Sequence, residues 1–213
     1  HLYRLYQLLF TCNYLAWINQ PVPLSTFYLT SLLICLIIVS FVFCLYVLTK
    51  NASIIDTFWS VGISAACLII CVTHIPFSWV QYAPLILIQL WGIRLASFMF
   101  VTRILKNKRD PRYERLIQNR PRPRLSAMRQ YILQAALQSL LTLSVFPMFT
   151  TPLQTTPWFY VAFGVGIGAI IFESFADIQL HRFKATQSGI CNVGLWSCSR
   201  HPNYFFDCLF WLG

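Results

Sequence analysis

Polar side chains gather near the end of the sequence, directly before an apolar run, where residues 194–213 read GLWSCSRHPNYFFDCLFWLG. Eight consecutive positions carry a guanidinium, an imidazole, an amide, a phenol and a carboxyl, on Arg200, His201, Asn203, Tyr204 and Asp207. Arginine is suited to bidentate phosphate contacts, and the N–H groups at a helix start add further donors. This stretch therefore predicts a site for a phosphorylated ligand.

Four more charged residues, Asp56, Arg94, Glu173 and Asp177, lie inside apolar segments. A charge at the centre of a bilayer costs about 2.5–3.5 kcal/mol on insertion scales, so each marks a candidate site. Local roles remain open, because Asp56 could cap its helix and Arg94 could extend towards the membrane surface. Glu173 and Asp177 are four residues apart and share a helix face. Together the four residues predict a polar cavity that opens to the cytoplasm.

The composition excludes an ordinary soluble domain, because 57% of the 213 residues are hydrophobic and only 10% are charged, against roughly 25% charged in soluble domains. The chain carries 16 Lys and Arg against 6 acidic residues. Most of these cations lie in the hydrophilic stretch 103–129. Such clustering is typical of a cytoplasmic loop under the positive-inside rule, so we expect membrane lipids and not nucleic acid as partners.

Apolar runs long enough for about 20 helical residues each predict membrane-spanning helices. They cover 26–48, 53–75, 79–101, 130–150 and 156–177, and a sixth begins near Tyr204. Residues 2–18 could form a further short span or an interfacial helix. The expected fold is an all-α polytopic membrane bundle, forming one transmembrane domain over residues 1–213. We expect the sixth span to continue beyond Gly213, so that the chain lacks the end of its domain.

These segments predict a multi-pass protein of the endoplasmic reticulum or a bacterial inner membrane, with its ligand site facing the cytoplasm. The 8 cysteines are scattered without zinc-type spacing, which favours neither a disulfide framework nor a metal site. Cysteine within an apolar run behaves as a small buried hydrophobe. We therefore expect no metal.

Two motifs, ADIQLHRFK (176–184) and GICNVGLWSCSRHPNYFFD (189–207), give the chain a resemblance to a known family. They resemble the C-terminal region of the steroid 5-alpha-reductase-like membrane proteins, in the branch described as 3-oxo-5-alpha-steroid 4-dehydrogenase-like. The stretches IIDTFWSVG (54–62), WGIRL (91–95) and DPRY (110–113) are similar to further motifs of that branch. The resemblance extends from about residue 50 to residue 213.

The resemblance implies a membrane reductase that uses NADPH to reduce a carbon–carbon double bond in a lipid or sterol-like substrate. It implies that Asp177, Asn203 and Tyr204 lie against the cofactor, with Lys184 near its phosphates and Arg200 and His201 at the mouth of the site. Glu173 and Asp207, from the same polar group, complete the candidate cofactor residues. This chain reads NYFFD where relatives read NYFGE, so Phe206 adds bulk beside the site.

Catalytic residues are assigned less directly, because the better-known steroid reductases use a Glu and a Tyr from early helices. The corresponding motifs are not clearly present in this sequence. We expect Asp56 to be the polar group near the substrate, with Tyr113 as a second candidate. A carboxyl at that position would need a raised pKa to donate a proton, which burial can supply.

Two other functions remain open from the sequence. Isoprenylcysteine carboxyl methyltransferases share the helical scaffold and an RHP-x-Y motif, in which case Arg200, His201 and Tyr204 would hold S-adenosylmethionine. Asn203 and the upstream ADIQL favour the reductase instead. A third alternative is a non-catalytic lipid-binding or scaffold relative, which the NYFFD departure would suit.

Overall fold

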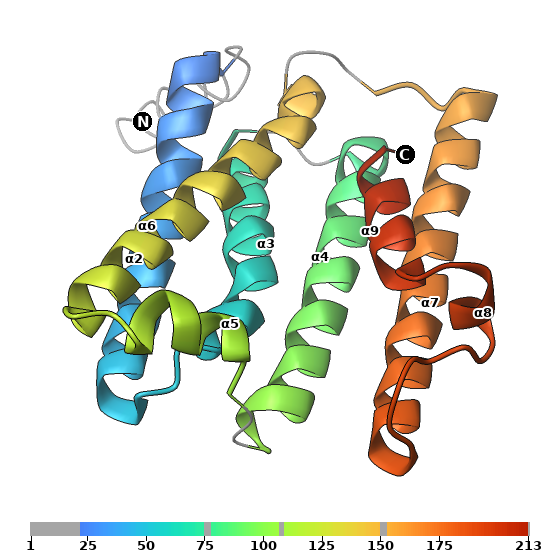
Figure 1. Cartoon of the computed structure of the whole chain (residues 1–213). Helices are drawn as coiled ribbons and strands as arrows, with labels where there is room; N and C mark the ends of the chain where they lie inside the picture. The colour runs from blue at the N-terminus through green and yellow to red at the C-terminus, as the bar shows by residue number, and fades with distance from the viewer. Residues whose placement is uncertain (1–21, 75–77, 107–108, 150–152, 213) are drawn as a thin grey trace, which may run out of the picture. The chain divides into compact units, whose positions relative to one another are not determined.

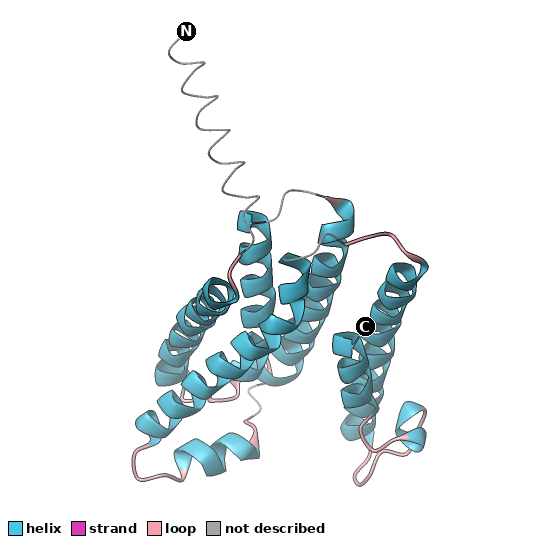
Figure 2. Ribbon diagram, turned by 90° about the horizontal axis from the view of Figure 1, so that it is seen from above, coloured by secondary structure: helices cyan, strands magenta, loops and turns pink. Residues whose placement is uncertain are grey.

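The computed structural model describes residues 22–74, 78–106, 109–149 and 153–212, and within these ranges it is helical with no strand (Figure 1, Figure 2). The chain divides into two compact units, residues 1–153 and residues 154–213, which are described separately below. The segment 2–18, considered above as a further span, lies outside the described residues.

Among the described residues, five helical stretches are long and apolar enough to cross a membrane, which confirms the all-α membrane bundle. They are Leu24–Thr49 (α2), Ile54–His74 (α3), Trp79–Ile104 (α4 and its continuation), Pro123–Met148 (α6 and its continuation) and Pro157–Thr186 (α7). The sixth segment, expected to begin near Tyr204, corresponds to α9 (Pro202–Leu212). Three of these helices, α6, α7 and α9, have proline at their first position, where its missing N–H has no intrahelical partner to lose.

Two helices extend beyond their expected bounds, because polar residues next to the apolar run are helical as well. The span expected at 130–150 begins earlier, since α6 runs over Pro123–Thr142 and is followed by the 3-10 segment η3 (Leu143–Phe149). The span expected to end at 177 continues to Thr186. Hydropathy detects only the part of a helix that suits hydrocarbon, so it misses helical turns that suit the headgroup region.

Helix α3 forms the centre of the first unit and packs against α2, α4 and α6. Small polar residues hold α3 to α4: Ser60 Oγ donates to the Gly92 carbonyl at 3.0 Å, and Gln89 Nε2 donates to the Ser64 carbonyl at 3.1 Å. A Cβ on Gly92 would collide with the Ser64 side chain. Small residues at this crossing thus permit the close approach that membrane helices use for packing.

The basic stretch 103–129, which was expected to be a cytoplasmic loop, contains short helical segments, while residues 119–122 form turns and bends and residues 120–124 are exposed. Helix α4 (Trp79–Met99) passes into the π-helical segment η1 (Phe100–Ile104). The short helix α5 (Pro111–Tyr113) is followed by a second π-helical segment, η2 (Glu114–Gln118). In Figure 1 these elements lie at the end of the first unit where α2 ends and α3 begins. Segments of π-helix occur frequently at functional sites.

The second unit consists of α7, the short helix α8 (Leu195–Cys198) and α9, with α9 packed along α7. The connection between α7 and α8 folds back onto α7. Trp196 Nε1 donates to the Ala176 carbonyl at 2.9 Å, and the Leu195 N–H donates to Gln179 Oε1 at 3.1 Å. Gly194 has φ of 62° and lies against the Gln179 side chain, a conformation that glycine adopts without strain. These contacts position the RHPNY segment at the start of α9.

Candidate functional site

The two predicted catalytic residues, which are 57 positions apart in the sequence, lie in contact. Tyr113 Oη donates to Asp56 Oδ1 at 2.6 Å. Arg103, on the π-helical segment η1, forms an ion pair with Asp56 Oδ2. The carboxylate is therefore bound from both sides by tertiary contacts, so its role is more than that of a local cap for α3.

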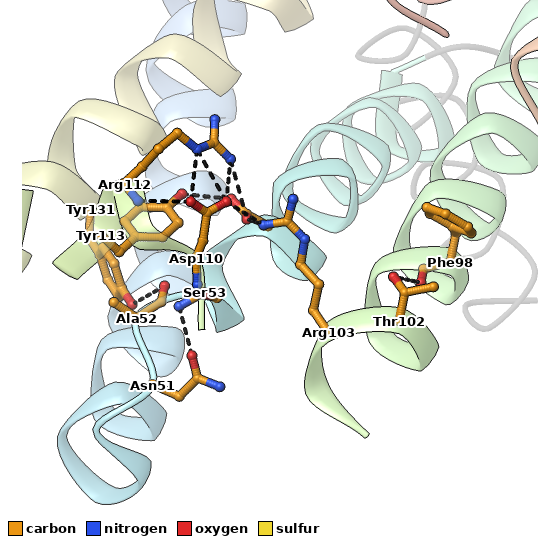
Figure 3. Close-up of polar contacts among 11 residues, drawn as sticks. Asn51, Ala52, Ser53, Phe98, Thr102, Arg103, Asp110, Arg112, Tyr113 and Tyr131 are labelled. Atoms are coloured by element: carbon orange, nitrogen blue, oxygen red, sulfur yellow. Dashed lines mark hydrogen bonds and ion pairs between the residues drawn. The ribbon is translucent and has the colours of Figure 1, made fainter. Parts of the chain in front are cut away.

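A second carboxylate, Asp110, extends this arrangement into a network (Figure 3). Asp110 Oδ2 accepts from Arg103 Nη1 at 2.9 Å and from Arg112 Nη2 at 2.7 Å. Arg112 Nη2 also lies 3.9 Å from Asp56 Oδ2. The carboxylates of Asp56 and Asp110 thus share the two guanidinium groups, and Asp56 also accepts a hydrogen bond from Tyr113. We call these five residues, Asp56, Arg103, Asp110, Arg112 and Tyr113, the acid–arginine network.

Backbone contacts fix the network to the turn between α2 and α3. The Asp110 N–H donates to Ser53 Oγ at 2.7 Å, and the Ser53 N–H donates to Asn51 Oδ1 at 3.1 Å. On the other side of this turn, Tyr131 Oη of α6 donates to the Ala52 carbonyl at 3.2 Å. Figure 3 shows these contacts converging on residues 51–53. The DPRY segment is therefore held by Ser53 of this turn, Asp56 of α3 and Arg103 of η1.

Charge within the network sets the ionisation of its members outside the membrane spans. The hydrogen bonds from Arg112 hold the pKa of Asp110 well below its usual range, and this effect outweighs the opposing effect of burial. Burial raises the pKa of Tyr113 well above its usual range, and the neighbouring Asp56 carboxylate raises it further. Tyr113 is consequently a neutral hydrogen-bond donor at physiological pH.

In the second unit, the predicted residues Asp177 and Asn203 are brought together, because Asn203 Nδ2 donates to Asp177 Oδ1 at 3.2 Å. Asp177 is 7% exposed and Glu173, one turn earlier on α7, is 4% exposed. Asn203 Oδ1 is buried and has no hydrogen-bond partner among the described residues. A buried acceptor of this kind is available to a ligand that carries a donor.

Four other predicted cofactor residues, Lys184, Arg200, His201 and Tyr204, are exposed in the second unit. The rings of His201 and Tyr204 stack with their centroids 5.4 Å apart. The His201 N–H donates to Ser199 Oγ at 3.2 Å, which fixes the backbone just before α9. Arg200 and His201 lie within three residues of Asn203 and, like Lys184, remain accessible to an anionic ligand.

Phe206, the departure from the family pattern, packs against α7. Its ring stacks on that of Phe172 with centroids 5.2 Å apart and an interplanar angle of 19°. The added bulk is thus accommodated between α7 and α9. Asp207, the last predicted cofactor residue, is half-buried on α9.

Sequence reasoning did not select Arg103, Asp110, Arg112 or Ser53 as site residues. Arg103 and Arg112 were assigned to the topology-setting basic stretch. Asp110 and Glu114 are the two acids among ten cations between positions 103 and 129, and acids in such basic surroundings are a signal that could have identified the network. The predicted meeting of Asp56 and Arg94 with Glu173 and Asp177 stays a prediction, because these residues belong to different units.

Comparison with known proteins gives one family match. A family model described as a protein of unknown function (DUF1295) matches residues 42–213. No curated protein and no solved structure gives a match. The matched range includes the acid–arginine network and the whole of the second unit. Since the match covers most of the sequence, the chain belongs to the DUF1295 family.

Proposed function

We propose that the chain is an NADPH-dependent membrane reductase of the steroid 5-alpha-reductase-like kind, acting on a carbon–carbon double bond conjugated to a carbonyl in a lipid or steroid-like substrate. The contact between Asp56 and Tyr113 carries this proposal. The better-known steroid reductases use a Glu and a Tyr from early helices, and here an aspartate at the start of α3 and the tyrosine of α5 form a hydrogen bond of 2.6 Å.

The chemistry of the pair suits the polarisation of an enone. A hydrogen bond to the carbonyl oxygen withdraws electrons from the conjugated double bond and makes the β-carbon a better hydride acceptor. Reduction then adds a hydride to the β-carbon and a proton to the α-carbon. Tyr113 has one O–H, which Asp56 accepts. A substrate carbonyl must therefore compete with Asp56 for this proton, and Arg103 can stabilise the carboxylate when it loses that hydrogen bond.

The second unit offers groups that fit a phosphorylated dinucleotide. When bound, NADPH would supply the hydride. Lys184, Arg200 and His201 are exposed cations or potential cations suited to phosphate. Asn203 Oδ1, which is buried without a partner among the described residues, can accept from an amide or hydroxyl of the ligand. Asp177 keeps the Asn203 amide oriented through the bond to Nδ2.

The decisive experiment measures cofactor binding to purified full-length protein in detergent. We expect NADPH to bind at micromolar concentration and S-adenosylmethionine not to bind. Binding of S-adenosylmethionine alone would assign the chain to the methyltransferases, and binding of neither ligand would favour a non-catalytic lipid-binding protein.

A variant separates catalysis from binding. Tyr113→Phe removes only the phenol oxygen, so we expect turnover of an enone lipid to fall by about a hundredfold, the lower end for a positioned proton donor, with NADPH affinity unchanged. Tyr160→Phe is the matched control, because Tyr160 is exposed on the first turn of α7. Normal turnover by Tyr113→Phe would exclude the acid–tyrosine pair from the reaction.

A further inference from the structure

A second candidate binding site lies in the first unit, where α2 ends and α6 begins. It is a pocket of about 580 Å³, within the range of about 300–1,000 Å³ found for small-molecule sites. Four cations line it: Lys50, Arg109, Arg122 and Arg124. Tyr46 of α2 and Leu125 of α6 contribute to its apolar part. We call this the basic pocket.

No carboxylate is among the described residues that line the basic pocket, whereas three arginines, Arg109, Arg122 and Arg124, are. The acid next in sequence to Arg109 is Asp110, whose carboxylate binds Arg103 and Arg112 of the acid–arginine network. Like charges that share a small volume repel each other, and a bound anion relieves that repulsion. Phosphate is an anion whose geometry suits bidentate hydrogen bonds from arginine.

The backbone conformation of Lys50 is a second observation in favour of a binding site. Lys50 ends α2 in the left-handed conformation with φ of 58°, and its N–H donates to the Tyr46 carbonyl at 2.8 Å. Glycine is the usual residue at such a helix end, because other side chains are disfavoured there. The chain instead places a long cationic side chain at a position where it lines the pocket.

The location of the basic pocket indicates a ligand that comes from the membrane. Tyr46 lies in the last turn of α2 and Leu125 in the first turn of α6, and both helices are long and apolar enough to span a bilayer. The ends of such helices lie at headgroup level, where tyrosine is enriched. Basic segments at this level attract anionic lipids of the cytoplasmic leaflet.

We propose that the basic pocket binds the phosphate of an anionic phospholipid in the leaflet on the basic side of the protein. This site is separate from the NADPH residues of the second unit and does not depend on the reductase proposal. A soluble nucleotide carries the same phosphate chemistry, so the experiment has one arm for each source.

The first arm measures lipid retention by native mass spectrometry of full-length protein from micelles with equal phosphatidylglycerol and phosphatidylcholine. We expect the wild type to retain phosphatidylglycerol selectively. The test variant combines Arg109→Gln, Arg122→Gln and Arg124→Gln. The control variant combines Arg115→Gln, Arg120→Gln and Arg129→Gln, which are exposed positions of the same basic stretch outside the pocket lining. Both variants lose the same charge.

We expect the test variant to lose about fivefold or more in phosphatidylglycerol retention and the control variant to retain it. An equal loss of phosphatidylglycerol retention in both variants would mean that only the overall charge matters, and it would overturn the proposal. Unchanged retention in both variants would overturn it as well. In the wild type, retention should fall when salt rises from about 0.05 to 0.5 M, because screening weakens exposed charge contacts. Retention that ignores salt would contradict a phosphate site, whatever the folding of the variants.

The second arm adds NADPH or inorganic pyrophosphate to the lipid-loaded wild type. We expect the retained phosphatidylglycerol to stay bound. Displacement by either soluble phosphate compound at millimolar concentration would assign the basic pocket to a soluble phosphate ligand and overturn the lipid assignment.

Discussion

The two units treat their carboxylates in different ways. In the first, Asp56 and Asp110 are bound by two arginines and Tyr113, and Asp56 and Asp110 are 17% and 12% exposed at their side chains. In the second, Asp177 accepts from the neutral amide of Asn203. Arg200 and His201 of the second unit's RHPNY region stay exposed.

The carboxylates of the first unit are neutralised by arginines, whereas Arg200 in the second unit is exposed and can bind a ligand. A carboxylate that is held by arginines contributes to the local fold, and its loss leaves those arginines with fewer carboxylate partners. An exposed cation next to a buried polar pair contributes little to stability but can bind an incoming anion. The comparison predicts that substitutions in the acid–arginine network change stability, whereas those near Asn203 change ligand affinity.

The largest effect is expected from Asp56→Ala. The substitution removes the acceptor of Tyr113 and a partner of Arg103, so the free energy of unfolding in detergent should fall by about 2–3 kcal/mol. Chemical denaturation followed by circular dichroism measures this. Asp56→Asn, which keeps an acceptor for Tyr113, should cost less. If Asp177→Ala in the second unit destabilises the protein as much as Asp56→Ala does, the contrast between the units is wrong.

Asn203→Ala tests the other side of the comparison. We expect NADPH affinity to fall about tenfold, which corresponds to about 1.4 kcal/mol, with little change in unfolding. Titration of the full-length protein with NADPH provides the measurement. The control is Asn192→Ala, an exposed asparagine of the preceding loop. An unchanged affinity in Asn203→Ala would remove Asn203 from the cofactor site.

Trp196→Phe tests whether the hydrogen bond of the Trp196 side chain positions the RHPNY segment. The change removes the indole N–H that donates to the Ala176 carbonyl at 2.9 Å, so the free energy of unfolding should fall by about 1 kcal/mol. Trp158→Phe is the control, since Trp158 is 77% exposed at the start of α7. Equal stability of the two variants would show that the Trp196 hydrogen bond does not fix the loop.

The smallest effect is expected for the stability of the protein at acidic pH. The pKa of Asp110 is lowered in the folded chain by Arg112, so its contribution to stability is present above the unfolded pKa of about 3.9 and is lost as pH falls further. We expect this loss to be under about 1 kcal/mol, because Arg112 is largely exposed. Unfolding measured from about pH 5 to pH 2 should show a shallower decline for Asp110→Asn than for the wild type. Identical slopes would mean that the Arg112 contact contributes nothing.

Much of the fold could be predicted because the apolar runs are long and uninterrupted. The spans at 26–48, 53–75 and 79–101 lie close to the helices α2, α3 and α4. The sequence was less informative at 103–129, where charge density predicted a cytoplasmic loop but not the short helical segments within it. Local composition does not reveal that Arg103 and Arg112 also lie near the Asp56 carboxylate, because Asp56 is far from both in the sequence.

The candidate site was predicted in part. Asp56 and Tyr113 were selected separately and the tertiary structure joins them, and the same holds for Asp177 and Asn203. Asp110 was missed because its importance comes from bridging two arginines rather than from burial within an apolar run. The assignment of these residues to catalysis and cofactor binding stays a prediction.

The sequence by itself determined that this is a helical membrane protein and which polar residues stand out, because hydrophobic length and isolated charge are local properties of a chain. Only the tertiary structure decided which polar residues meet. Helix packing brings the turn after α2, the end of α4 and the DPRY segment to one end of the first unit, and hydrogen bonds then select partners that no sequence spacing encodes.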